Sequence, residues 1–245
     1  MKIVRWMCAL LMVGALAGCV KIDQTLTLEK DGSGFFEINY GMSEETVQQM
    51  ENMQKMQAAM GEDDEEADDS NMFDFDTDKI KDEFSKMEQD GIKLVSVSSE
   101  TKDGWKYMNI KISFDNLEAL SKTDFLSDGT FSLTKNEDGN YVINQKSAGM
   151  GDDDEMTPEM KQMMLQQMAP AMKGMHIAMN VVVPSKIIDS NAMVVNGNKA
   201  SWVFDVDKDP SFLVDSKMQD VHIEFAGKGI NLPDITFGGD SDEME

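Results

Sequence analysis

The sequence predicts an α+β fold, and three observations support this prediction. Segments in which apolar and polar residues alternate follow one another around short glycine-containing turns, as in antiparallel hairpins. Between these hairpins, other stretches carry apolar residues, mostly methionine, at helical spacing. The two cysteines, Cys8 and Cys19, lie within the first 19 residues, so the rest of the chain needs an ordinary packed core in place of disulfides.

The alternating segments predict an antiparallel sheet. The first of them, residues 20–29, has one face that is apolar except for a single glutamine, and that face consists of Val20, Ile22, Gln24, Leu26 and Leu28. An Asp-Gly-Ser-Gly turn leads from it to a return strand, and Asn196-Gly197-Asn198 forms a tight turn later in the chain. The predicted strands cover residues 20–29, 35–40, 92–100, 105–114, 131–134, 141–144, 175–184, 192–195, 200–206 and 221–226.

Three longer helices are predicted from caps and spacing. Ser43 caps the first helix, which carries methionines at helical intervals. The second begins after Thr77 or Asp78, directs Ile80, Phe84 and Met87 toward the core, and ends at Gly91. The third opens at Thr157-Pro158, is lined by methionines and ends at Gly174. Residues 116–120 and 210–216 predict short helical turns.

The acidic runs define the domain organisation. Residues 61–72 and 147–156 are rich in aspartate and glutamate, and such runs repel themselves and form exposed loops. Residues 237–245 form a Gly/Asp/Glu tail that we expect to be disordered. Between the N-terminal leader and this tail, residues 19–236 are expected to form a single α+β domain with two acidic, Met-rich helical insertions.

The N-terminus predicts a leader that is removed. Lys2 and Arg5 precede an apolar run over residues 6–16, as in a secretory signal peptide, and the run is too short to span a bilayer. The following Leu-Ala-Gly-Cys resembles the bacterial lipobox, in which cleavage falls between Gly18 and Cys19 and the cysteine is acylated. The alternative is a plain signal peptide followed by a chance cysteine. Under the lipobox interpretation residues 1–18 are the leader, and Val20 in place of aspartate favours the outer membrane if the source has one.

Charge limits the class of partner. The chain carries 46 acidic and 22 basic residues, for a net charge of −24. Arg5 is the sole arginine, and it lies in the predicted leader. Because arginine supplies the bidentate contacts to phosphate and base edges, we expect no nucleic-acid partner. The expected partner is a membrane, reached through the acyl anchor on Cys19.

Two patterns resemble metal sites. Met172, Met175 and His176 are soft donors close in sequence, which would suit copper(I), although methionines at helical spacing are also ordinary core packing. Alternating aspartates at 74–78 and 205–209 resemble the start of a calcium-binding EF-hand loop, but glycine and glutamate are missing from its later positions. We therefore interpret these aspartates as helix caps and turn residues, and we predict no cofactor.

Catalytic patterns are missing from the sequence. It contains neither a Gly-x-Ser-x-Gly elbow nor a His-Glu-x-x-His motif nor a phosphate-binding glycine loop. The two histidines, His176 and His222, fall in predicted strands, where packing is a commoner role than general-base catalysis. We therefore expect no enzymatic activity.

Two stretches of the chain resemble a known family. Cys19 is followed by a strand, Asp-Gly-Ser-Gly and a second strand, and residues 183–205 contain Val-Pro-Ser-Lys, Val-Asn-Gly-Asn and Ser-Trp-Val-Phe-Asp. These segments are similar to the bacterial LppM-type lipoprotein domain, although Ser185 and Ala192 stand where that family often has glycine. The resemblance implies a curved antiparallel sheet packed on helices, of the helix-grip or START-like kind, with an apolar cavity. Trp202 and Phe204 share one face of a strand and are candidates for lining that cavity or for the core.

The expected protein is thus a cell-envelope lipoprotein on the extracytoplasmic side of a membrane. Its soluble domain is expected to be a binding module for a lipid-like ligand or an envelope protein. The alternative is a metal-handling envelope protein that uses its methionine and carboxylate clusters.

Overall fold

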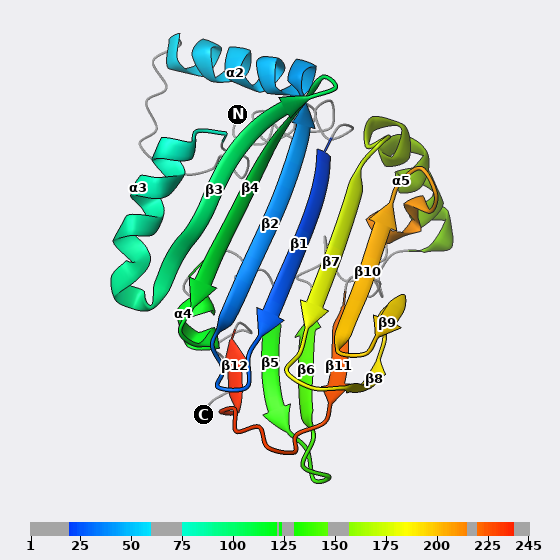
Figure 1. The fold of residues 1–245 in the computed structure, drawn as a ribbon. Helices are drawn as coiled ribbons and strands as arrows, with labels where there is room; N and C mark the ends of the chain where they lie inside the picture. The colour runs from blue at the N-terminus through cyan, green and yellow to red at the C-terminus, as the bar shows by residue number, and fades with distance from the viewer. Residues whose placement is uncertain are drawn as a thin grey trace, which may run out of the picture.

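The computed structural model describes residues 20–59, 75–121, 123, 130–146, 157–214 and 220–237. Within these residues it shows two β-sheets with helices at their margins, and the predicted α+β class is confirmed (Figure 1). Cys19, the leader, the acidic runs at 61–72 and 147–156 and residues 238–245 lie outside the described residues.

The larger sheet, sheet A, has seven strands in the order β3-β4-β2-β1-β7-β10-β9. Its strands are β1 (Val20–Leu28), β2 (Gly34–Ser43), β3 (Ile92–Lys102), β4 (Trp105–Phe114), β7 (His176–Val182), β9 (Val194–Asn196) and β10 (Lys199–Asp205). Neighbouring strands are antiparallel except β1 and β7, which run parallel with Gln24 opposite Met179. This parallel pair joins the first hairpins of the chain to its final third.

The smaller sheet, sheet B, has five antiparallel strands in the order β12-β5-β6-β11-β8. Its strands are β5 (Thr130–Lys135), β6 (Tyr141–Lys146), β8 (Ile187–Ser190), β11 (Val221–Phe225) and β12 (Ile235–Phe237). In Figure 1 they lie behind and below the end of sheet A at which β1 finishes. Sheet B therefore covers one end of sheet A, and the helices α2 (Glu44–Ala59) and α5 (Pro158–Ala171) lie at the other end.

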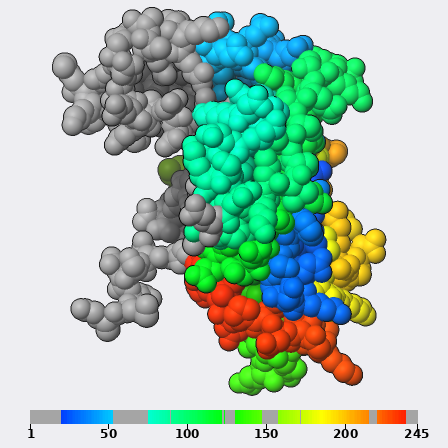
Figure 2. Space-filling view, turned by 60° about the vertical axis from the view of Figure 1, so that its left-hand side comes forward, coloured from blue at the N-terminus to red at the C-terminus, as the bar shows by residue number. Residues whose placement is uncertain are grey.

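The helices begin where their sequence signals predict. In α3 (Thr77–Met87) the Asp76 carboxylate accepts hydrogen bonds from two backbone N–H groups, while α5 (Pro158–Ala171) is capped by the Thr157 hydroxyl. Directly after α3, a 3₁₀ turn, η2 (Glu88–Asp90), ends at Gly91. The φ of Gly91 is 85°, a left-handed conformation that suits glycine. The remaining elements are α2 (Glu44–Ala59), α4 (Leu117–Ser121) and η5 (Pro210–Leu213). Figure 2 shows α3 along the β3 side of the molecule, above α4 and the C-terminal segment.

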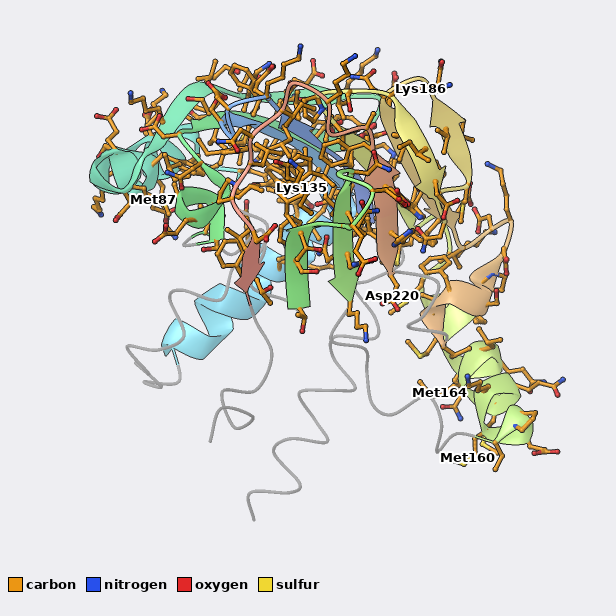
Figure 3. All side chains as sticks on the ribbon, turned by 90° about the horizontal axis from the view of Figure 1, so that it is seen from below. Met87, Lys135, Met160, Met164, Lys186 and Asp220 are labelled. Atoms are coloured by element: carbon orange, nitrogen blue, oxygen red, sulfur yellow. The ribbon has the colours of Figure 1, made fainter. Side chains whose placement is uncertain are left out.

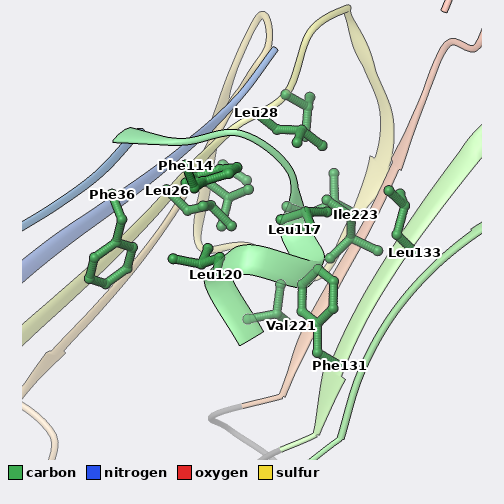
Figure 4. Close-up of a cluster of buried hydrophobic side chains, with 14 of the residues drawn as sticks. Leu26, Leu28, Phe36, Phe114, Leu117, Leu120, Phe131, Leu133, Val221 and Ile223 are labelled. Atoms are coloured by element: carbon green, nitrogen blue, oxygen red, sulfur yellow. The ribbon is translucent and has the colours of Figure 1, made fainter. Parts of the chain in front are cut away.

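One hydrophobic core joins the two sheets. Leu28 and Phe114 from sheet A and Leu133 and Ile223 from sheet B are all 2% exposed or less and belong to a single cluster (Figure 4). Leu120 of α4 is fully buried in the same cluster. At about 25 cal/mol per Å² of apolar surface removed from water, burial of this kind is the main stabilising contribution in a chain without disulfides in its core.

Several elements differ from the sequence prediction. The strands are divided between two sheets, and β8 and β12 were not predicted. The prediction that a strand begins at residue 192 is wrong, because β9 begins at Val194. Phe237, expected to begin the tail, instead ends β12 opposite Phe131, with the two rings 6.1 Å apart. Strands of three or four residues are too short for alternation to identify them.

Candidate functional site

The face of sheet A that packs against sheet B, called here the inner face, is not uniformly covered. Register places Leu26, Phe36 and Val181 side by side on this face, and all three are buried, at 8%, 6% and 8% exposure. One step toward the opposite end, the corresponding positions on β1, β2 and β7 are Gln24, Ile38 and Met179. These three side chains are only half-buried. Sheet B therefore seals the inner face at one level and leaves the adjoining level partly open.

Two further apolar residues extend this open region. Ile22 and Ile177 lie opposite each other on β1 and β7, two residues along from Gln24 and Met179, and both are half-buried. We define the Gln24 surface as Ile22, Gln24, Ile38, Ile177 and Met179. It is apolar apart from one amide group, which is the usual character of a site for an apolar molecule with a few polar atoms.

Buried side chains border the Gln24 surface on both sides. Met108 and Ile110 of β4 border it on the β2 side, at 0% and 9% exposure. On the β10 side, Trp202 lies directly opposite Met179 and Phe204 opposite Ile177, at 2% and 3% exposure. The ring of Phe204 packs against Phe212 of η5 at 5.2 Å between centroids. The half-buried residues thus form the centre of the inner face, and the two candidate cavity residues stand at its margin.

Trp202 has an unusual polar group. Its indole Nε1 is buried and has no hydrogen-bond partner among the described residues. A buried donor left unpaired costs roughly 1–3 kcal/mol, so such groups are uncommon in folded proteins. That Trp202 and Phe204 line a cavity stays a prediction, while their position on the inner face beside the Gln24 surface is clear.

The three weak copper(I) candidates, Met172, Met175 and His176, each have contacts within the described fold. Met172 and Met175 pack against the hydrophobic core. His176 is paired by the β7–β10 register with Asp205, and its Nδ1 lies 3.7 Å from an Asp205 carboxylate oxygen. Within the described ranges, the histidine, cysteine and carboxylate side chains form no group of three or more that could hold a metal ion.

The aspartates of the two calcium-like stretches serve local structure. Asp76 caps α3, and the N–H groups of Asp78 and Lys79 lower the pKa of its carboxyl. The pKa of Asp205 is lowered mainly by the hydrogen bond that its carboxylate accepts from the Lys208 ammonium. Asp209 caps η5, and hydrogen bonds from Ser211 lower its pKa. The interpretation of these residues as caps and turn residues is confirmed for the described positions; Asp74 lies outside them.

The second histidine connects strands. His222 Nδ1 lies 2.7 Å from the side-chain oxygen of Asn144, and Nε2 lies 3.7 Å from the carboxylate of Asp189. These contacts join β11 to its neighbours β6 and β8. The Ser190 hydroxyl donates a hydrogen bond to the backbone carbonyl of His222, at 2.8 Å, which adds a further link between β8 and β11.

The Gln24 surface was not identified from the sequence, although one signal for it was present. A glutamine stands alone among apolar residues on the inner face of β1, at the position where coverage by sheet B ends. A polar residue at an otherwise apolar position is the pattern that could have indicated a site. Ile38 and Met179 join it only through strand pairing, which alternation does not reveal.

No helix of the described residues has the length and apolarity needed to cross a bilayer. No family model and no curated protein matches the sequence. Among solved structures, the chain is similar to the folded domain of LppM from Mycobacterium tuberculosis, determined by NMR. The two are 12% identical, with 85% of this chain and 90% of that chain covered and a TM-score of 0.40. This likeness carries no argument about individual residues, so the proposals below rest on the side chains of this chain.

Proposed function

We propose that this chain is a lipid-anchored cell-envelope protein whose domain binds a lipid-like ligand on the Gln24 surface without catalysis. The observation that carries the proposal is the half-buried apolar region of Ile22, Ile38, Ile177 and Met179 around one amide side chain. An acyl chain would cover the apolar side chains, and a polar group of the ligand would pair with the Gln24 amide.

The unpaired indole of Trp202 supports the same ligand class. Trp202, which carries this N–H, is paired directly opposite Met179, and Met179 belongs to the Gln24 surface. An ester, amide or hydroxyl oxygen would supply the acceptor that the described structure lacks. A ligand with a long apolar part and one or two acceptor oxygens therefore fits these residues better than a purely hydrocarbon molecule.

The lipid anchor comes from the sequence. Cys19 follows Leu-Ala-Gly at the end of a leader-like apolar run, and acylation there would hold the domain at a membrane. Val20 after the cysteine favours the outer membrane where one exists. A binding domain fixed at a bilayer would meet its lipid-like ligand at the membrane surface.

A ligand titration with matched variants tests the binding proposal. The Cys19→Ser chain is titrated with a fluorescent phospholipid, and Ile38→Trp is introduced to fill the Gln24 surface. Thr25→Trp adds the same bulk to the opposite face of the neighbouring strand, because Thr25 pairs with Glu37 there. Loss of binding in Ile38→Trp with binding retained in Thr25→Trp supports the site. Equal affinity in both variants contradicts it.

A second candidate function, docking of an envelope protein, is favoured by exposed apolar residues around β9. Val194 of this edge strand is 60% exposed, and Ile188, Met193, Val195 and Val203 nearby are 41–53% exposed. Exposed apolar edge strands invite pairing with another chain. A photo-crosslinking residue at Val194 that yields one defined adduct in the native envelope, with none from a crosslinker at Glu37, would support docking there.

A further inference from the structure

Two aromatic rings and a lysine form a cluster on the outer face of sheet A, the face opposite the inner face. The Trp105 and Tyr107 rings are stacked with their centroids 6.2 Å apart and an interplanar angle of 23°. The Lys21 Nζ lies 3.8 Å from the centroid of the Trp105 ring. A cation over an indole face is held by the ring quadrupole, so the three side chains form one connected unit.

Gly41 makes this cluster possible. Register places Gly41 between Lys21 of β1 and Tyr107 of β4. A Cβ atom at Gly41 would lie 2.6 Å from two carbons of the Tyr107 ring, so the ring occupies the space above this glycine. Because Gly41 has no side chain, the Tyr107 ring can lie directly against the backbone of β2.

The cluster lies next to the predicted anchor. Cys19 is bonded directly to Val20, the first residue of β1, and Lys21 is the second. At about 3.3 Å per residue of strand, Lys21 is roughly 7 Å along the chain from Cys19. Each interfacial layer of a bilayer is on the order of 5–8 Å thick, so acyl chains on Cys19 would bring this end of sheet A to the membrane surface.

The residue types match that environment. Tryptophan and tyrosine have an apolar ring with a polar group and are enriched at the membrane–water interface. A lysine beside them can extend its ammonium toward lipid phosphates while its stem stays on apolar surface. Trp105 and Lys21 are both half-buried at this end of the sheet. The local cation also matters because the whole chain carries a net charge of −24 and is otherwise repelled by anionic headgroups.

We infer that Lys21, Trp105 and Tyr107 are a membrane-contact surface that seats the domain against the bilayer in which Cys19 is anchored. This inference rests on the proposed lipid anchor and is independent of the ligand on the Gln24 surface. It predicts a fixed orientation of the domain, with β1 beginning at the membrane and the β5–β6 hairpin pointing away from it (Figure 1).

Tryptophan fluorescence in vesicles tests this orientation. The mature lipidated chain retains two tryptophans, Trp105 and Trp202, once the leader containing Trp6 is removed. Trp202→Phe leaves Trp105 as the reporter, and Trp105→Phe leaves the buried Trp202. Each variant is reconstituted in phosphatidylcholine vesicles with and without brominated acyl chains. In the Trp202→Phe chain, Trp105 emission should fall roughly twofold with brominated lipid, as for a residue in the interfacial layer. A fall in the Trp105→Phe chain reports lipid bound beside Trp202 on the Gln24 surface, not membrane contact of this cluster.

A matched control lies on the same face of the same sheet. Phe35 of β2 also has a lysine over its ring, with Lys111 Nζ 4.8 Å from the centroid. Phe35 is six residues from Gly41, which is about 20 Å along β2. Phe35→Trp in a background lacking Trp105 and Trp202 should therefore show no quenching.

Vesicle flotation and the intact mass of the chain distinguish failure of the proposed lipid anchor from failure of the membrane-contact surface. If the chain lacks acyl mass and does not float with vesicles, the anchor proposed above is wrong. If it is acylated and floats but Trp105 is not quenched, or if Phe35→Trp is quenched equally, the membrane-contact surface is wrong. Because the quenching is measured on Trp105 in its native position, the test does not depend on a disruptive substitution within the cluster.

Discussion

Replacement of Trp202 by phenylalanine tests the description of the inner face most sharply. The change removes the unpaired Nε1–H and about three buried ring atoms while keeping an aromatic ring on β10. Lost burial costs roughly 1–2 kcal/mol at about 0.8 kcal/mol per buried methylene. Removal of an unpaired buried donor returns roughly 1–3 kcal/mol. The two contributions offset, so the free energy of unfolding should fall by no more than about 1 kcal/mol.

Urea unfolding of the Cys19→Ser chain measures this change, and two further variants calibrate it. Trp202→Ala removes the whole 2%-exposed side chain and should cost about 3–5 kcal/mol. Phe204→Leu changes volume at the neighbouring inner-face position without altering a hydrogen bond, and should cost about 1–1.5 kcal/mol.

A loss well above about 2 kcal/mol in Trp202→Phe would show that the indole N–H is paired in solution, which would contradict its description as an unpaired donor. The same variant should lower affinity for a ligand with an acceptor oxygen while leaving affinity for a hydrocarbon analogue unchanged. Equal losses for both ligands would remove Trp202 from the proposed recognition.

Three other predictions concern separate parts of the chain. Gly41→Ala places a Cβ against the Tyr107 ring and should cost about 1–3 kcal/mol and change the near-ultraviolet circular dichroism, whereas in a Tyr107→Ser background most of this cost should vanish. Thr157→Ala removes the cap of α5 and should cost about 1 kcal/mol if global unfolding reports it, with faster hydrogen exchange at the Met160 amide; Thr157→Ser should retain the cap. The lowered pKa of Asp205 means that its carboxylate stabilises the fold above the ordinary aspartate pKa and that this contribution is lost as the pH falls through the lowered value. Lys208→Met should raise the Asp205 pKa and move that loss to higher pH, as followed by carboxyl NMR titration; an unchanged titration would contradict the assigned cause.

Local signals were sufficient for most elements of the fold. The alternation of Val20, Ile22, Leu26 and Leu28 predicts β1 and its inner face, because the side-chain period of a strand is two. The Thr157-Pro158 start of α5 follows from capping and from the fixed φ of proline. Each of these signals lies within one segment and needs no knowledge of its neighbours.

Features that depend on distant partners could not be predicted from local patterns. The parallel pairing of β1 with β7 joins residues about 155 positions apart in sequence, as between Lys21 and His176. The half-burial of Gln24, Ile38 and Met179 depends on where sheet B ends over sheet A. The Gly41–Tyr107 contact likewise depends on the register of β2 with β4.

Methionine content gave an incomplete prediction for α5. Figure 3 shows this helix standing away from the two sheets, with Met160 and Met164 on it. Met160 and Met163 are 52% and 61% exposed, whereas Met172 beyond the helix packs against the core. Helical spacing identifies a stripe of methionines but does not say how much of that stripe reaches the core.

Native mass spectrometry of the Cys19→Ser chain, isolated from its own cell envelope, shows whether the domain carries a lipid-like ligand. We expect a bound species of defined lipid mass that is retained in Thr25→Trp and lost in Ile38→Trp. A spectrum of unliganded protein alone, unchanged after incubation with envelope lipid extract, would contradict the assignment of a lipid-like ligand to the Gln24 surface.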